Sequence, residues 1–462
     1  MFRGLTRFLP GSGEPLKNPP DSQENAVEAP TPQVIPRSEH PVSRQQISDA
    51  ALKVLYRLNG AGFEAYLVGG CIRDALLGET PKDFDVATNA TPEQVRDLFR
   101  NSRLIGRRFR IVHVRFGREI IEVTTFRGKP QDEHGDHIAQ QSDAGLLLRD
   151  NVWGNIEEDA LRRDFTVNAL YYSIADFSIH DFAGGIGDIN ARTLRLIGDP
   201  ETRYREDPVR MLRAVRFAAK LGFEIAPNTE APMYDLAPLL LQIPPARLFD
   251  EALKLFMSGH GLLTFQLLSH YGLFGMLFPE AEEAMADAAW VERLIEQALR
   301  NTDQRIANDL PVTPAFLFAA FLWGPVALRL EALEAEGMPT VPALQTASQQ
   351  VVMRQLEHVS IPKRFGMPMR EIWELQARLP QRRGKRAFQS REHPRFRAAF
   401  DLLLLREQAG EIPRGLGDWW EAFQQGDEHE QRRLLQKVGG DPASQGDRRR
   451  KKRRKPSRKS DQ

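Results

Sequence analysis

Residues 66–86 read YLVGGCIRDALLGETPKDFDV, and the rest of the chain is expected to be organised around this stretch. An apolar strand over Ala65–Val68 runs into Gly69 and Gly70, and a helix is predicted directly after them. Glycine lets another molecule approach the main chain closely, and a helix N-terminus presents free N–H groups to an anion. The turn is therefore a candidate phosphate site, to which Arg73 would add a forked cation.

Two aspartates close the same stretch. Asp83 and Asp85 are two residues apart, and side chains at that spacing on a strand project from the same face. Adjacent carboxylates are costly to bury unpaired, whereas a divalent cation offsets their repulsion and prefers oxygen ligands. An isolated D-x-D is common on solvated surfaces, so the predicted metal site depends on the order of glycine turn, helix and paired aspartates.

Two further motifs combine charge with helical periodicity. RRDFTVNAL at residues 162–170 places Asp164 where an N-cap would stand, a purely structural role. EDPVRMLRAVRF at residues 206–217 predicts a helix with Asp207 as its N-cap and Gly222 beyond its end. Four cations share one face of this helix, which is either solvated or part of a site: Arg210, Arg213, Arg216 and Lys220.

Glu122 is an additional acidic candidate. Residues 109–116 and 119–126 are predicted to form paired strands around a turn, with Glu122 on an otherwise largely apolar ribbon. It is either an edge-strand carboxylate paired with a neighbouring arginine or a residue beside the metal site. The residues do not decide between Glu122 and Asp164 as a third active-site carboxylate.

The motifs in this order resemble the nucleotidyltransferase superfamily, in the branch that holds bacterial poly(A) polymerases and tRNA CCA-adding enzymes. The resemblance implies catalytic carboxylates at Asp83, Asp85 and Asp164, with Asp83 and Asp85 holding two Mg²⁺ ions. It also implies a set of nucleotide-binding residues: Gly69, Gly70 and Arg73 at the triphosphate, Arg163 and Asn168 near the sugar and phosphates, Asp207 with Arg210 at the base edge, and Arg213.

The reaction implied by the resemblance is template-independent transfer of AMP from ATP to an RNA 3′ end, with release of pyrophosphate. Its partners would be ATP and RNA 3′ ends, including mRNA, small RNA and decay intermediates, and RNA-decay proteins. The segment Leu104–Val114 and the helical, basic C-terminal region are similar to bacterial poly(A) polymerases. The alternatives are a CCA-adding tRNA nucleotidyltransferase and, more distantly, a non-catalytic RNA-binding adaptor.

Composition separates a mildly acidic body from a strongly basic tail. Residues 448–459 contain 10 Lys or Arg and no acid, whereas the preceding 447 residues hold 53 basic against 61 acidic side chains. Such a tail suits a polyanion and repels itself too strongly to fold alone. The basic stretch Arg382–Arg397 also contains Phe388 and Phe396, a combination that suits single-stranded RNA.

A single cysteine, Cys71, excludes an intrachain disulfide and a cysteine-rich zinc site, and it indicates a reducing cytoplasm. The longest apolar run, Ala315–Leu328, is 14 residues, so no membrane segment is expected. His134 and His137 are a candidate metal pair, but the sequence offers no further ligands at suitable spacing, so a mobile polar loop is the favoured interpretation.

The expected fold is an α/β nucleotidyltransferase head with a short mixed β-sheet, followed by an all-α neck and body. The predicted divisions are a disordered N-terminal segment (1–45), the catalytic head (46–190), the neck that binds base and RNA (191–275), the RNA-binding helical body (276–440) and the disordered basic tail (441–462).

Overall fold

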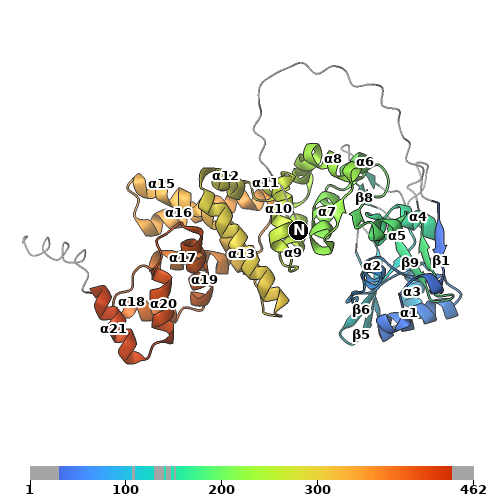
Figure 1. Ribbon diagram of the computed structural model, residues 1–462, viewed down its shortest axis with the longest axis horizontal. Helices are drawn as coiled ribbons and strands as arrows, with labels where there is room; N and C mark the ends of the chain where they lie inside the picture. The colour runs from blue at the N-terminus through green and yellow to red at the C-terminus, as the bar shows by residue number, and fades with distance from the viewer. Residues whose placement is uncertain (1–30, 107–109, 129–139, 142–146, 150–151, 440–462) are drawn as a thin grey trace, which may run out of the picture.

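The computed structural model describes residues 31–106, 110–128, 140–141, 147–149 and 152–439. Figure 1 shows a β-sheet with its helices at one end, helices around α7 to α10 in the middle, and a further helical part at the other end. The predicted fold class, an α/β head followed by a helical neck and body, is confirmed. His134, His137 and the basic tail lie outside the described residues.

The head is built on a mixed sheet of eight strands in the order β1-β10-β9-β2-β3-β6-β5-β4. Every neighbouring pair is antiparallel except β3 and β6, which run parallel. The strands are β1 (Gln33–Ile35), β2 (Ala65–Val68), β3 (Asp85–Thr88), β4 (Ser102–Ile105), β5 (Ile111–Phe116), β6 (Glu119–Thr125), β9 (Leu170–Ser173) and β10 (Ile179–Asp181).

The N-terminal boundary of the head was predicted too late in the chain. Residues 1–30 lie outside the described part, but disorder up to residue 45 is wrong for residues 31–45. Strand β1 pairs with β10 at the edge of the sheet, and Val42 is 1% exposed in the core. The His40 ring bonds to the Phe177 carbonyl at 2.9 Å, which fastens this segment to the loop before β10.

Local signals around the central stretch correctly predicted its elements. Helix α1 (Asp49–Gly60) begins at the Ser48 cap and packs on β2, β3 and β6. The strand–turn–helix expectation corresponds to β2 followed by α2 (Gly70–Leu76). Helix α3 (Pro92–Leu98) begins at the predicted capping box of Thr91 and Gln94. The predicted hairpin is β5 and β6.

Shorter elements link strands β6 and β9 of the sheet and, after β10, lead from the sheet to the neck. They are β7 (Gln140–Gln141), β8 (Leu147–Arg149), α4 (Ile156–Leu161), η3 (Thr166–Asn168), α5 (Gly185–Asn190), β11 (Thr193–Leu194) and α6 (Pro200–Glu206). The neck continues with α7 (Val209–Leu221), β12 (Glu224–Ile225), α8 (Pro227–Leu236), η4 (Ala237–Gln242), α9 (Pro245–Phe256), α10 (Gly261–His270) and α11 (Leu273–Leu277). Two 3₁₀ turns, η1 (Arg37–Glu39) and η2 (Arg44–Gln46), precede α1.

The body contains only helices in the described part of the chain. They are α12 (Pro279–Asp287), α13 (Ala289–Ala307), α14 (Pro314–Phe321), α15 (Trp323–Ala335), α16 (Thr340–His358), α17 (Lys363–Arg378), α18 (Lys385–Arg391), α19 (Phe396–Ala409), α20 (Leu416–Gln425) and α21 (Glu428–Gly439). Among these described helices no single one is long and apolar enough to cross a membrane; α14 and α15, bent by 49°, have that length and composition only together.

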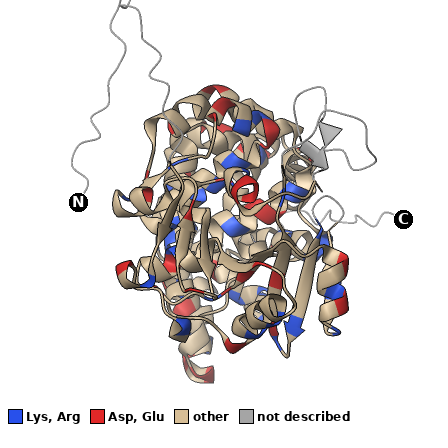
Figure 2. Cartoon of the chain, turned by 90° about the vertical axis from the view of Figure 1, so that its right-hand side faces the viewer, with Lys and Arg blue, Asp and Glu red and all other residues tan. Residues whose placement is uncertain are grey.

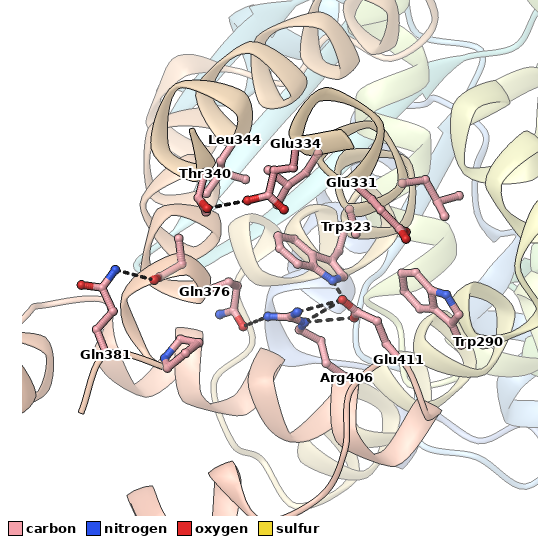
Figure 3. Close-up of a pocket in the computed structure, with 15 residues that line it drawn as sticks. Trp290, Trp323, Glu331, Glu334, Thr340, Leu344, Gln376, Gln381, Arg406 and Glu411 are labelled. Carbon is pink, nitrogen blue, oxygen red and sulfur yellow. Dashed lines mark hydrogen bonds and ion pairs between the residues drawn. The ribbon is translucent and has the colours of Figure 1, made fainter. Parts of the chain in front are cut away.

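A largely buried ion pair joins the helices of the body beside a pocket (Figure 3). Arg406 at the end of α19 pairs with Glu411 at 2.8 Å, lies over the Trp323 ring, and donates to Gln376 at 3.0 Å. The Trp323 indole N–H also donates to Glu411, at 2.8 Å. These polar groups on the wall of the pocket therefore all have partners, and the network holds α15, α17 and α19 together.

Candidate active site

A cleft of about 920 Å³ between the head and helix α7 gathers most of the predicted site residues. Nine of them line it: Gly69, Gly70, Arg73, Asp83, Asp85, Arg163, Asp164, Asn168 and Arg213. These residues come from four separate parts of the chain, so the fold brings together the glycine turn, the paired aspartates, the second motif and the basic helix.

The glycine turn depends on backbone conformation. Gly69 has φ +83°, in the left-handed region that other residues rarely adopt, and it stands at the N-cap of α2. A Cβ at this position would make only ordinary contacts, the nearest at 3.7 Å from the Arg163 guanidinium. The need for glycine is therefore conformational, and the turn directs the start of α2 toward the cleft.

The two aspartates lie on either side of a buried anchor. Asp85 is the first residue of β3, and Asp83 lies two residues before the strand begins. Phe84 between them is 6% exposed and packs in the core. Although only Asp85 is in the strand, both aspartates line the cleft, as their spacing predicted.

The environment of Asp85 disfavours its charge in the ligand-free protein. Burial, followed by the nearby Glu122 carboxylate, raises the pKa of Asp85 to about 6, although the Arg163 guanidinium opposes the shift. Asp83 adds to the repulsion. A cation between these oxygens would relieve that unfavourable charge.

The donor set fits Mg²⁺ only with help from the substrate. No group of three metal-binding side chains occurs among the residues that the structure describes. Mg²⁺ commonly uses one or two carboxylates together with substrate phosphates and water. Asp83 and Asp85 match that pattern, and burial together with the Glu122 carboxylate raises the pKa of Asp85 despite the opposing Arg163 guanidinium, so a bound cation would stabilise its charged form.

Asp164 does not cap a helix, contrary to the structural alternative. Its carboxylate accepts from the Phe165 N–H at 2.9 Å and the Asn168 amide at 3.2 Å, and it pairs with Arg213 of α7. Burial alone would raise the pKa of Asp164, but Arg213 and these hydrogen bonds lower it to about 2. Asp164 is thus an anion already held between head and neck.

Glu122 lies on an inner strand, so the expectation of an edge-strand carboxylate is wrong. Strand β6 lies between β3 and β5, and Glu122 is in register with Asp85. Its partner is His113, at 3.1 Å, and not an arginine. Glu122 is therefore adjacent to Asp85, although it is not part of the cleft lining.

The basic face of α7 is directed partly into the cleft. Arg213, Arg216 and Lys220 line it, while the apolar positions opposite are buried as predicted. Gly222, with φ +64°, ends the helix as expected. The predicted cap is wrong: the Asp207 carboxylate pairs with Arg247 at 2.7 Å and makes no cap. Asp207 instead ends α6, and Pro208 precedes α7.

The predicted base-reading pair lies outside the cleft lining in this structure. Arg210 bonds to Glu206 at 2.8 Å and to the Arg203 carbonyl at 2.6 Å. One Asp207 oxygen, Oδ1, is buried without a hydrogen-bond partner among the described residues. Arg210 and Arg213 are one helical turn apart, so the pair is adjacent to the cleft, and its role stays a prediction.

Several cleft residues were not predicted as site residues. Arg216 and Lys220 were on the predicted basic face, which is a usable signal. Asp74 follows Arg73 directly. Arg192, Ser258 and His260 come from connecting segments of the neck, and no local pattern points to them because only the packing of neck against head places them at the cleft.

The basic stretch Arg382–Arg397 keeps its exposed cations but not both of its aromatic rings. Phe396 is 5% exposed and packs in the core on Phe400 and Trp420. Phe388 packs against Phe423. Phosphate attraction therefore remains available in this stretch, whereas stacking of a base on Phe396 is not.

The outer surface of the head carries both acidic and basic side chains, so its charge is not of a single sign. Figure 2, which views the molecule from the head end, shows acidic and basic residues interspersed over the ribbons. Attraction for a polyanion must therefore come from particular clusters, such as the cations of the cleft, rather than from the head as a whole.

Comparison with protein-family models matches three segments of the chain. Residues 65–195 match the poly A polymerase head domain, and residues 222–285 match the probable RNA and SrmB-binding site of polymerase A. Residues 336–459 match the polymerase A arginine-rich C-terminus. The first match contains the paired aspartates and the second motif.

Comparison with known proteins separates near from distant relatives. The chain is 52% identical to poly(A) polymerase I of Salmonella typhi over 466 residues, covering 99% of both chains. It is 39% identical to the CCA-adding enzyme of Lactobacillus helveticus over 217 residues, covering 47% of this chain and 52% of that one. The solved CCA-adding enzyme of Bacillus stearothermophilus with CTP aligns at a TM-score of 0.51 and 28% identity, covering 81% of this chain and 80% of that one.

Proposed function

Because the chain belongs to the bacterial poly(A) polymerase family, we infer that it is a nucleotidyltransferase that adds AMP from ATP to RNA 3′ ends without a template. The resemblance predicted from the motifs is confirmed by a relative that is 52% identical over 99% of the chain. CCA-adding relatives match about half of it. The observation that carries the inference is a single cleft holding the glycine turn and both paired aspartates.

In the proposed reaction, the RNA 3′ oxygen forms a bond to the α-phosphorus of ATP, and the bond from that phosphorus to the bridging oxygen breaks. Pyrophosphate leaves, and the 3′-hydroxyl proton passes to solvent water. Bound Mg²⁺ would favour the deprotonated 3′ oxygen and neutralise charge on the pyrophosphate. Asp83 and Asp85 would hold the ions, and no covalent intermediate with the protein is needed.

The remaining contacts to the nucleotide are proposed from the cleft lining. Gly69, Gly70 and Arg73 would hold the triphosphate, with Arg163 and Asn168 near the sugar and phosphates. Arg213, on the wall formed by α7, would supply a further cation. Asp207 and Arg210 would read the base edge after the nucleotide enters, which requires exchange of their present ion pairs.

The test of this function is incorporation of each nucleotide separately, using purified full-length protein, a short unstructured RNA and Mg²⁺. We expect extension with ATP and much less with CTP, GTP or UTP. A CCA-adding enzyme would incorporate CTP and prefer a tRNA that lacks its 3′ end. A non-catalytic adaptor would bind the RNA and extend it with no nucleotide.

The cellular setting is proposed from the chemistry of the chain. A buried single cysteine and an RNA substrate favour the cytoplasm, and addition of AMP there would promote RNA decay in concert with decay proteins. We propose that the head spans residues 31–190, that the neck extends to 275, and that the body extends to 440.

Truncation of the basic tail is expected to weaken RNA capture without harming catalysis. Residues 448–459 of the tail have no acid, aromatic or apolar run, so they can add neither core packing nor a catalytic group. Its cations release counterions on meeting phosphates, so the salt slope should flatten by roughly 0.7 for each single-strand phosphate that the shortened protein no longer neutralises. Ending the chain at Gly446 should therefore weaken RNA binding most at low salt.

The measurement is RNA affinity across a salt series for three proteins: full length, the truncation, and a full-length control with the tail cations changed to glutamine. The last two should behave alike, while thermal unfolding and addition at saturating RNA stay near wild type. Identical salt slopes for all three proteins would mean that the tail does not bind RNA, and Arg382–Arg397 and the neck would remain as candidate RNA-binding regions.

A further inference from the structure

A circuit of polar contacts, closed by the backbone of helix α7, connects helix α2 of the head to helix α7 of the neck around the cleft. Its members are Lys220, Asp74, Arg73, Asn168, Asp164 and Arg213, and each contacts the next. Lys220 and Arg213 are seven residues apart on α7, which places them two turns apart on the same face. The circuit thus begins and ends on the neck helix and passes through the head.

Asp74 lies in this circuit between the cations Arg73 of the head and Lys220 of the neck. Its Oδ1 accepts from Arg73 Nε at 2.9 Å and from Arg73 Nη2 at 2.6 Å. Its Oδ2 lies 3.6 Å from the Lys220 ammonium. One carboxylate therefore bridges a cation of the head and a cation of the neck.

These contacts orient Arg73 but use only some of its N–H donors. A guanidinium has five N–H donors, of which two are directed to Asp74 and one to the Asn168 side-chain oxygen. Two donors remain. The Arg73 side chain is 3% exposed, lines the cleft and lies 5.3 Å from the centre of the Phe217 ring of α7. Its position is thus fixed on the head side by Asp74 and Asn168 and on the neck side by Phe217.

We propose that Asp74 is a positioning residue for the nucleotide: it holds Arg73 toward the triphosphate and, through Lys220, keeps the phosphate-binding turn in register with the neck helix. This inference rests on the proposed function of the cleft. Asp74 does not touch the reacting atoms. Its contacts set the direction of the remaining Arg73 N–H donors. Because Asp74 also pairs with Lys220, that direction depends on the position of α7.

The expected kinetic effect follows from contacts that bind the substrate and the transition state equally well. Phosphate contacts made equally before and during the reaction lower KM for ATP without raising kcat. Asp74→Asn removes the charge that orients Arg73, so KM for ATP should rise about tenfold while kcat stays within about threefold, consistent with the usual strength of charge-assisted hydrogen bonds. Lys220→Met removes only a part-exposed ion pair, so a rise in KM of up to about fivefold is expected.

The experiment measures kcat and KM for ATP in full-length wild type, Asp74→Asn, Lys220→Met and the double variant. Lys254→Met is the matched control, because Lys254 is 49% exposed against 44% for Lys220, also pairs with a carboxylate, and lies outside the cleft lining. The Lys220→Met effect should disappear when Asp74 is already asparagine, since the coupling passes through that carboxylate.

Three results would overturn the proposal: an unchanged KM in both single variants, a loss confined to kcat, or a Lys220→Met effect that persists in full in the double variant. If Asp74→Asn does not fold, Lys220→Met against Lys254→Met still decides, because both positions are part-exposed. Wild-type AMP addition in the same assay tests the proposed function separately. Active wild type with unaltered variants would reject only the role of Asp74.

Discussion

Replacing Asp85 with asparagine is expected to abolish AMP addition while leaving the ligand-free protein at least as stable as wild type. The carboxylate is one of two candidate metal ligands, and losing it should cost about 4 kcal/mol or more in the transition state, a factor of about a thousand. Asparagine keeps the shape of the side chain and removes only the charge. Asp83→Asn should lose activity similarly, since it removes the other candidate ligand.

The stability part of this prediction follows from the raised pKa. The folded pKa of Asp85 is about 6, above its ordinary value near 4, so the folded protein binds this proton more tightly than the unfolded chain. Ionisation of Asp85 therefore destabilises the fold as pH rises from about 4 to 6, by at most about 3 kcal/mol. Asparagine removes that penalty at neutral pH.

Thermal unfolding with and without Mg²⁺, together with single-turnover AMP addition, checks both parts. Mg²⁺ should raise the Tm of wild type and not that of Asp85→Asn. Asp97→Asn, the same change at an exposed aspartate of α3, should alter neither activity nor the Mg²⁺ response. Addition by Asp85→Asn within tenfold of wild type would reject the metal assignment.

The pH dependence of activity offers a second readout of the same group. Below pH about 6, Asp85 becomes protonated and Mg²⁺ must compete with the proton. At limiting Mg²⁺, AMP addition should therefore fall as pH decreases through about 6, and a higher Mg²⁺ concentration should restore it. A decline that no concentration of Mg²⁺ reverses would assign the pH dependence to another group.

The sequence predicted those parts of the site that depend on neighbours in the chain. The strand before Gly69, the helix after it, the capping box at Thr91 and the hairpin at β5 and β6 all arise from signals within about ten residues. Because these elements are local, Asp83 and Asp85 reached the cleft as expected even though only one of them is in a strand.

Contacts between distant segments were not predictable in the same way. Strand β1 has three residues and no periodic pattern, and it exists because β10 offers an unpaired edge about 145 residues later. Glu122 lies beside Asp85 only because β3 and β6 pair in parallel across two intervening strands of sequence. Asp207 resembles an N-cap locally, but Arg247 of α9 holds its carboxylate instead. In each case a tertiary contact decides the structure, and at Asp207 it overrides a local preference.

Identifying the third active-site carboxylate requires both the local sequence motif and the tertiary contacts. Asp164 has the motif and lines the cleft, but Arg213, Asn168 and a backbone N–H already occupy its oxygens. Glu122 lies outside the cleft lining, yet it is in register with Asp85, about 5 Å away at the backbone, and its side chain is 46% exposed. Its Oε1 bonds to the His113 ring at 3.1 Å, which leaves Oε2 for a cation.

We therefore expect Glu122→Gln to reduce the rate of AMP addition about 100- to 1,000-fold with little change in thermal unfolding, as for loss of one electrostatic contact to the transition state. Asp164→Asn should instead destabilise the protein by about 3 kcal/mol, because it leaves Arg213 facing a neutral group in a largely buried site. Its activity per folded molecule should fall less than that of Glu122→Gln.

The control is His113→Asn, which removes the partner of Glu122 and keeps the carboxylate. If Glu122 acts beside Asp85, this variant should retain most activity; if the pair with His113 is what matters, the two changes should have equal effects. The measurements are single-turnover rates and denaturant unfolding for all three variants. A residue that only joins head to neck must lower stability when its charge is removed. A large loss of activity in Asp164→Asn with unchanged stability would therefore identify Asp164, and not Glu122, as the third active-site carboxylate.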